Sequence, residues 1–117
     1  MTTKPDTNKK PDVRIDTARR NLRIAAALRD MNLSKISIAA GMSRNGLGQF
    51  VNGRTSLSYA NMLAVCDVLN IPISVVHKAD AITETKIRLY QALERMPDHL
   101  IMDALAEIQK GMAQHTH

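Results

Sequence analysis

The segment from Leu33 to Asn52 constrains the fold of this chain more than any other part of the sequence. Two short helices that cross at a steep angle through a tight turn need a small residue at their approach and a glycine in the turn. Ser37 supplies the small residue, and Gly41 supplies the glycine four residues later. Apolar residues stand at the offsets that face a shared core, namely Ile36, Ala40, Met42, Leu47 and Phe50. Together these features indicate a helix-turn-helix unit.

The rest of the chain shows helical periodicity and no useful run of strand-like alternation. Its 5 glycines and 4 prolines among 117 residues favour helices over turn-rich β structure. We expect seven helices, over residues 17–31, 33–40, 44–51, 59–69, 73–77, 81–95 and 97–113. The expected N-caps are Asp16 or Thr17, Asn32, Ser43 and Ser58. The predicted fold class is all-α, with a five-helix domain followed by two C-terminal amphipathic helices.

Charge is unevenly distributed along the chain, whose formal net charge is +5. Residues 1–78 carry 12 Lys and Arg against 5 Asp and Glu, whereas residues 79–117 carry 4 against 6. We therefore divide the chain into a flexible basic arm (1–16), a domain that meets an anionic partner (17–78) and a helical association segment (79–117). The alternative is an ordinary fluctuation of surface charge.

One run of residues resembles a known family of DNA-binding proteins. The run GMSRNGLGQFVNG, from Gly41 to Gly53, is similar to the phage-repressor and Cro-like (XRE) helix-turn-helix family, and in particular to its lambda-repressor-like domains. The region of Leu57, Asn61, Leu63 and Ala64 continues the resemblance, and so does Ala18-Arg19-Arg20 near the lysine-bearing arm. The resemblance covers about residues 1–78 and has no counterpart for residues 79–117. It implies a lambda-repressor-like domain that binds double-stranded DNA.

In this family the third helix lies in the major groove, with its N-terminal residues against the base edges. The resemblance therefore assigns base contacts to Arg44, Asn45 and Gln49. Arginine pairs with guanine in a bidentate manner, and asparagine and glutamine pair with adenine in the same way. Ser43 and Gly48 lie on the same side, where we expect a close approach to DNA.

Phosphate contacts are expected on both sides of that helix. The residues assigned to them are Ser34, Lys35, Asn52, Arg54, Thr55 and Ser58. The family commonly has glutamine one position before Ser34, where this chain has Leu33. In the arm, Lys4, Lys9 and Lys10 would wrap the duplex. The alternative is an ordinary tail in which Asp6 and Asp12 offset the lysines.

Apolar residues recur at near-helical spacing in the last third of the chain. The residues expected to form a dimer interface are Leu93, Leu100, Ile101, Leu105 and Ile108. The alternative is that both helices pack back on the same domain. A homodimer would present two recognition units to the two halves of a palindrome, one helical turn apart.

These features predict a sequence-specific transcriptional regulator, a repressor that binds a palindromic operator as a homodimer. The alternative is an antitoxin that also regulates its own operon, with the acidic end of the chain binding a toxin protein. No nucleophile beside a base, paired carboxylates or phosphate-binding loop indicates an enzyme. No cofactor or metal is expected, since the histidines near the C-terminus lack partners at ligand spacing.

The compartment is expected to be the cytoplasm. The first 23 residues contain no apolar run resembling a signal-peptide core, and no window approaches a membrane span. The single cysteine, Cys66, cannot form an internal disulfide and is expected to be a buried thiol.

Overall fold

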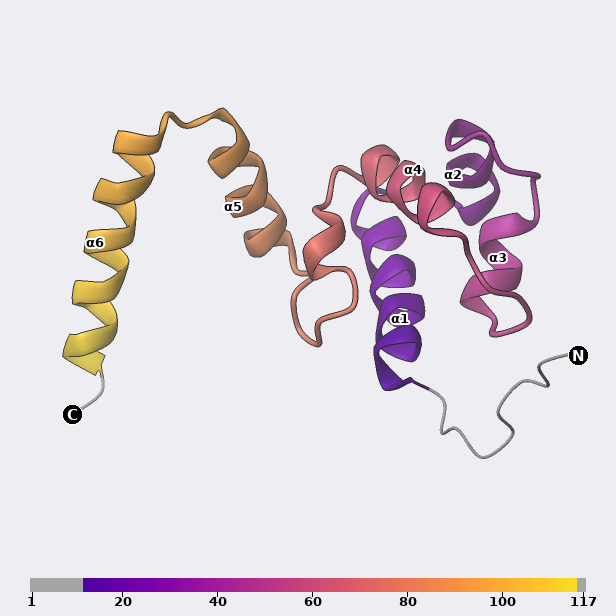
Figure 1. The fold of residues 1–117 in the computed structure, drawn as a ribbon, viewed down its shortest axis with the longest axis horizontal. Helices are drawn as coiled ribbons and strands as arrows, with labels where there is room; N and C mark the ends of the chain where they lie inside the picture. Colours follow the sequence, from indigo (N-terminus) through magenta and orange to yellow (C-terminus); the bar gives the residue numbers. More distant parts are fainter. Residues whose placement is uncertain (1–11, 116–117) are drawn as a thin grey trace, which may run out of the picture.

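The computed structural model describes residues 12–115, and all regular structure in this part of the chain is helical (Figure 1). The elements are α1 (Val13–Leu28), α2 (Leu33–Ala39), α3 (Gly46–Val51), α4 (Tyr59–Leu69), the 3-10 turn η1 (Ile73–Val75), α5 (Glu84–Arg95) and α6 (Asp98–His115). The described residues include no strand, which confirms the all-α prediction. Helices α1 to α4 lie together, and α6 stands at the far end of a molecule 55 Å long.

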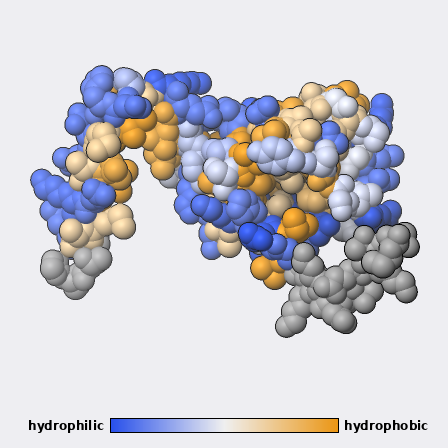
Figure 2. Space-filling view, viewed as in Figure 1, coloured by the Kyte–Doolittle hydropathy of each residue, from blue (hydrophilic) through white to orange (hydrophobic). Residues whose placement is uncertain are grey.

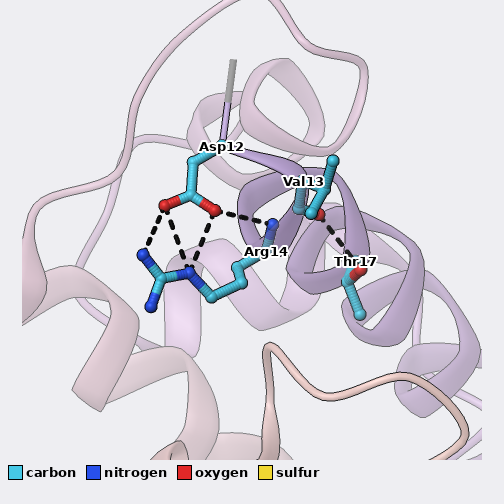
Figure 3. A network of polar contacts seen from close by, with 4 residues as sticks. All are labelled: Asp12, Val13, Arg14 and Thr17. Atoms are coloured by element: carbon cyan, nitrogen blue, oxygen red, sulfur yellow. Dashed lines mark hydrogen bonds and ion pairs between the residues drawn. The ribbon is translucent and has the colours of Figure 1, made fainter. Parts of the chain in front are cut away.

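Helix α1 begins before the predicted caps. Its N-cap is Asp12, whose carboxylate accepts a hydrogen bond from the backbone N–H of Arg14 at 2.9 Å and pairs with the guanidinium of Arg14 at 2.6 Å (Figure 3). The hydroxyl of Thr17 donates to the carbonyl of Val13 inside the helix, so it caps nothing. The prediction of a helix start at Asp16 or Thr17 is therefore wrong, and residues 13–16 are not part of an arm.

Helix α2 and the turn after it follow the sequence prediction closely. Asn32 is the N-cap, and its side chain accepts a hydrogen bond from the backbone N–H of Lys35 at 2.8 Å. Gly41 has φ +78, the left-handed conformation that glycine adopts most readily. The hydroxyl of Ser37 is fully buried and accepts a hydrogen bond from the backbone N–H of Leu47 at 2.9 Å. This bond fixes α3 to α2 across the turn.

Helix α3 is shorter than predicted. Ser43 is not its N-cap, since α3 begins at Gly46 directly after Asn45. The Ser43 carbonyl accepts from the Gly46 N–H at 3.0 Å and closes a turn over Arg44 and Asn45. Asn45 precedes the helix without a side-chain capping bond. Arg44 and Asn45 consequently lie in the turn before α3 instead of in its first helical turn.

Helix α4 confirms its predicted cap, whereas the element after it is shorter than predicted. The Ser58 hydroxyl accepts a hydrogen bond from the backbone N–H of Asn61 at 3.1 Å. The helix ends at Asn70, which has φ +57, a conformation that asparagine tolerates better than most residues. The chain is extended at Pro72 and then makes only the single 3-10 turn η1, so the expected fifth helix over residues 73–77 is reduced to this turn.

The packed core joins helices α1, α2, α3 and α4, and it continues beyond residue 78. Its buried apolar members are Leu22, Ala25, Ala26, Ile36, Leu47, Phe50, Val51, Val65, Cys66, Leu69, Ile71, Val76, Ala81, Ile82 and Ile87. Asn21 is buried beside them and donates to the carbonyls of Val76 and Lys78 at 2.7 and 2.8 Å. Because Ala81, Ile82 and Ile87 lie in this core, the packed unit includes residues that we had assigned to the association segment.

The two C-terminal helices form a helical hairpin in which the helices lie apart from each other (Figure 1). Helix α5 has Thr83 as its N-cap and begins at Glu84, not at Ala81, while α6 begins at Asp98 and continues to His115. The hydroxyl of Tyr90 donates to the carbonyl of Ala81 at 2.7 Å and holds α5 to the preceding loop. Within the described residues, α6 packs along no other helix. The alternative in which both helices fold back on the domain is therefore wrong for α6.

Candidate nucleic-acid interface

A shallow hollow lies where the start of α2 meets the turn before α3. The residues that line it are Leu33, Ser34, Arg44, Asn45, Gly48, Gln49, Asn52 and Arg54. All three residues predicted to contact bases belong to this set, and so do three of those predicted to contact phosphates. The structure thus brings together residues that span 22 positions of the sequence.

The polar side chains of this hollow are available to a ligand. Arg44, Asn45 and Gln49 are exposed, and the lining contains two arginines and no carboxylate. At Gly48 an added Cβ would meet nothing within 4 Å in this chain. The glycine is therefore not required by internal packing, and its bare backbone leaves room for another molecule to approach. Such a surface suits an anionic partner that offers hydrogen-bonding edges.

Arginines of α1 extend the basic surface to the other end of α3, which sequence reasoning did not predict. A second hollow is lined by Asp16, Arg19, Arg20, Arg23, Val51, Asn52 and Gly53. Arg23 donates to the side-chain oxygen of Asn52 at 3.0 Å, so Asn52 links this hollow to the first one. Arg20 is exposed and has no hydrogen-bond or ion-pair partner among residues 12–115. The signal in the sequence was the spacing of three arginines along one helix.

Arg19 has a structural role in this arrangement. Its Nε donates to the carbonyl of Phe50 at 2.8 Å, and its guanidinium lies 4.9 Å from the centre of the Phe50 ring. It also pairs with Asp16 at 3.0 Å. These contacts hold the C-terminal end of α3 against α1, and they leave Arg20 and Arg23 as the cations that face outward.

Several predicted residues lie outside the two hollows. Lys35, Thr55 and Ser58 are exposed but do not line either of them. The hydroxyl of Ser58 serves as the cap of α4, and the carbonyl of Thr55 accepts from Arg19 at 3.5 Å. Ser43 is exposed at the edge of the turn that precedes α3. The predicted arm residues Lys4, Lys9 and Lys10 lie outside the described residues.

The described residues offer no competing chemical centre at this surface. No group of three or more His, Cys, Asp and Glu side chains lies within reach of a common metal ion in the described part of the chain. None of its helices is long and apolar enough to cross a membrane. Cys66 is buried, and burial raises the pKa of its thiol to about 11, which keeps it protonated and unreactive at neutral pH.

Comparisons with protein-family models, with curated proteins and with solved structures found no match for this chain.

Proposed function

We propose that the chain is a sequence-specific double-stranded DNA-binding protein in which α2, the turn at Gly41 and α3 act as a helix-turn-helix unit. The observation that supports this proposal best is the gathering of Arg44, Asn45 and Gln49 in one hollow without a carboxylate. Arginine, asparagine and glutamine are the side chains that pair in a bidentate manner with guanine and adenine in the major groove. Their shared position on a small, rigid unit matches what base recognition requires.

The two hollows divide the contacts with DNA by type. Arg44 and Asn45 precede α3 and enter the groove first, and Gln49 follows one helical turn later. Phosphate contacts flank these base contacts and position the protein on the duplex. The residues we assign to phosphates are Ser34, Asn52 and Arg54 at the first hollow, and Arg20 and Arg23 at the second.

The interior of the unit supports α3 at both ends. The buried bond from the Leu47 N–H to the Ser37 hydroxyl fixes its start, and Arg19 against Phe50 fixes its end. A recognition element must keep its geometry to discriminate between base pairs, since each good bidentate contact contributes only about 1–3 kcal/mol. Rigid support of a short helix is thus consistent with reading sequence.

One such unit covers half of an operator, so we propose that the chain acts as a homodimer on a palindrome and regulates transcription, with repression as the simplest outcome of operator binding. Helices α5 and α6 lie away from the proposed DNA surface (Figure 1). This placement leaves them available to join two copies while both recognition units face DNA.

Selection from a random DNA pool with the purified full chain tests the proposal. We expect enrichment of one palindromic motif whose half-sites lie about one helical turn apart. Arg44→Ala should blur the motif at one position of each half-site. Arg29→Ala, a matched loss of an exposed arginine outside the two hollows, should leave the motif unchanged. A pool that stays random with the unmodified chain would overturn the proposal.

A further inference from the structure

Helix α6 exposes a continuous apolar face, which we call the α6 seam and define as Ile101, Leu105, Ile108 and Met112. Three of its members, Leu105, Ile108 and Met112, are 41%, 50% and 62% exposed. Their 4-3-4 spacing is that of the contact positions in paired helices. The charged residues of this part of α6, Asp103, Glu107 and Lys110, all fall away from the seam around the helix.

Most of the seam is uncovered within the described residues, since Leu105, Ile108 and Met112 are exposed and only Ile101 is partly buried. Helix α5 is held to the domain by buried Ile87, and its Leu89 and Leu93 lie on the opposite face, 44% and 38% exposed. In the space-filling view, hydrophobic residues gather between the two arms of the hairpin (Figure 2). Most helical stability in proteins comes from the packing of an amphipathic face. The exposed seam is therefore available to a partner from outside this chain.

The spacing of the seam favours a second copy of the same chain. A 4-3-4 order is identical when read in reverse, so a two-fold axis places Leu105 opposite the partner's Ile108 and Ile101 opposite the partner's Met112. An isologous contact of this kind closes on itself as a dimer. An antiparallel arrangement also opposes the two helix dipoles.

Gly111 is a second, independent observation at the same face. A glycine inside a helix costs about 1 kcal/mol relative to alanine, so its presence needs a reason. An added Cβ at Gly111 would meet nothing within 4 Å in this chain, which means that internal packing does not require it. Ala104 lies one heptad earlier on the same flank of the seam. Antiparallel pairing brings Ala104 beside the partner's Gly111, where small residues let two helix backbones approach closely.

We propose that α6 pairs with α6 of a second copy of this chain, antiparallel along the α6 seam, with Ala104 and Gly111 at the closest approach. In this pair, Leu89 and Leu93 of each α5 cover the side of the paired helices. The inference rests on the proposed DNA-binding function for its purpose, because it supplies the homodimer that a palindrome requires.

Sedimentation of the full chain tests the pairing with two adjacent substitutions. Leu105→Asp places a charge in the seam, and Ala106→Asp places the same charge on the opposite face. We expect a dimer for the unmodified chain and for Ala106→Asp, and a monomer for Leu105→Asp. Because α6 packs along no other helix, Leu105→Asp should leave the unfolding of the α1–α4 unit unchanged. A monomeric parent chain, or a dimeric Leu105→Asp chain, would overturn the inference.

Cysteine cross-linking tests the antiparallel orientation. In a Cys66→Ala background, one chain carries Ala104→Cys and another carries Gly111→Cys. An antiparallel pair forms a disulfide only when the two chains are mixed. Cross-linking within each single variant, without an increase on mixing, would show a parallel pair and contradict the proposal.

The DNA-binding proposal and the pairing can fail separately. Arg44→Ala should remain a dimer while its operator binding weakens. Leu105→Asp should still bind a single half-site, and its affinity for the full palindrome should fall by about 100-fold or more as the linked second contact is lost. A dimer that selects no DNA would refute only the function. A monomer that selects an operator would refute only the pairing.

Discussion

We propose that the outward cations of α1, Arg20 and Arg23, contact phosphates, whereas the residues in the turn before α3 contact bases. Arg20 lines the second hollow without a partner among the described residues, whereas Arg19 is occupied by Phe50 and Asp16. A phosphate contact carries no sequence information, but each one releases a counterion on binding. The adjacent arginines Arg19 and Arg20 are thus distinguished by their contacts and not by their residue type.

We predict that Arg20→Ala weakens binding to operator and to unrelated DNA by similar factors. The slope of log affinity against log salt should fall by about 1, as expected for the loss of one phosphate contact. Binding titrations at several salt concentrations measure both quantities. Lys86→Ala, the loss of a cation at the start of α5, is the control and should leave the slope unchanged. A changed operator preference for Arg20→Ala would instead indicate base contact.

The buried thiol of Cys66 makes the free energy of unfolding depend on pH, and the sign of this dependence follows from burial. Its pKa is raised from about 9 to about 11, because the interior disfavours the thiolate and Asp67 adds repulsion. The unfolded chain loses this proton first as the pH rises, so the thiol's contribution to stability is full below pH 9 and disappears towards pH 11. Urea unfolding between pH 8 and pH 11 should show a steeper loss of stability for the parent chain than for Cys66→Ala. Parallel curves would contradict the assignment.

Two glycines in the same short segment serve different purposes at the level of the element. Gly41 has φ +78 in the turn, whereas Gly48 lies inside α3 with open space where a Cβ would be. Gly41→Ala should therefore lower the free energy of unfolding by about 1–2 kcal/mol, since an L-residue is strained there. Gly48→Ala should raise it by about 0.5–1 kcal/mol, since alanine favours the helix.

The two glycine substitutions also distinguish an effect on stability from an effect on DNA binding. Gly48→Ala should weaken operator binding despite its greater stability, because the added methyl group occupies the proposed approach to DNA. Gly41→Ala should retain operator affinity under conditions where it is folded. Denaturant unfolding and operator titration on both variants provide the comparison. A Gly48→Ala chain that binds the operator as tightly as the parent would place the DNA elsewhere.

Helix caps show which elements a sequence can predict. Asn32 and Ser58 were identified correctly, because a cap and the helix that it starts lie within four residues of each other. The start of α1 was missed because Asp16 and Thr17 were the expected caps, whereas Asp12 caps the helix one turn earlier and pairs with Arg14. The fifth helix was overestimated because Pro72 marks a possible start but does not determine the length that follows.

The candidate site was predictable to the extent that the motif is local. Arg44, Asn45, Gln49 and Asn52 lie within one short segment, and the structure gathers them as expected. The contribution of α1 was not predictable, because the bond from Arg23 to Asn52 spans 29 residues. Periodicity identifies which face of a helix is apolar, but it does not reveal which distant loop that face meets.

At the scale of the whole molecule, α5 and α6 differ although the sequence suggested one segment. Helix α5 contributes Ile87 to the core, and the loop before it contributes Ala81 and Ile82. Helix α6 contributes no buried residue and extends from the far end of α5 (Figure 1). The packed core therefore extends past residue 78 to Ile87, and we propose that association of two copies belongs to α6 alone.

Two truncated chains test this division. A chain that ends at Met96 should keep the stability of the parent under conditions where the parent is monomeric, while losing its ability to dimerise. A chain that ends at residue 78 should lose several kcal/mol more, because burying each isoleucine contributes about 1.5–3 kcal/mol. Denaturant unfolding measures the stability of each truncated chain, and sedimentation measures its ability to dimerise. Equal stability of the two truncated chains would show that α5 belongs with α6, as the charge distribution alone had suggested.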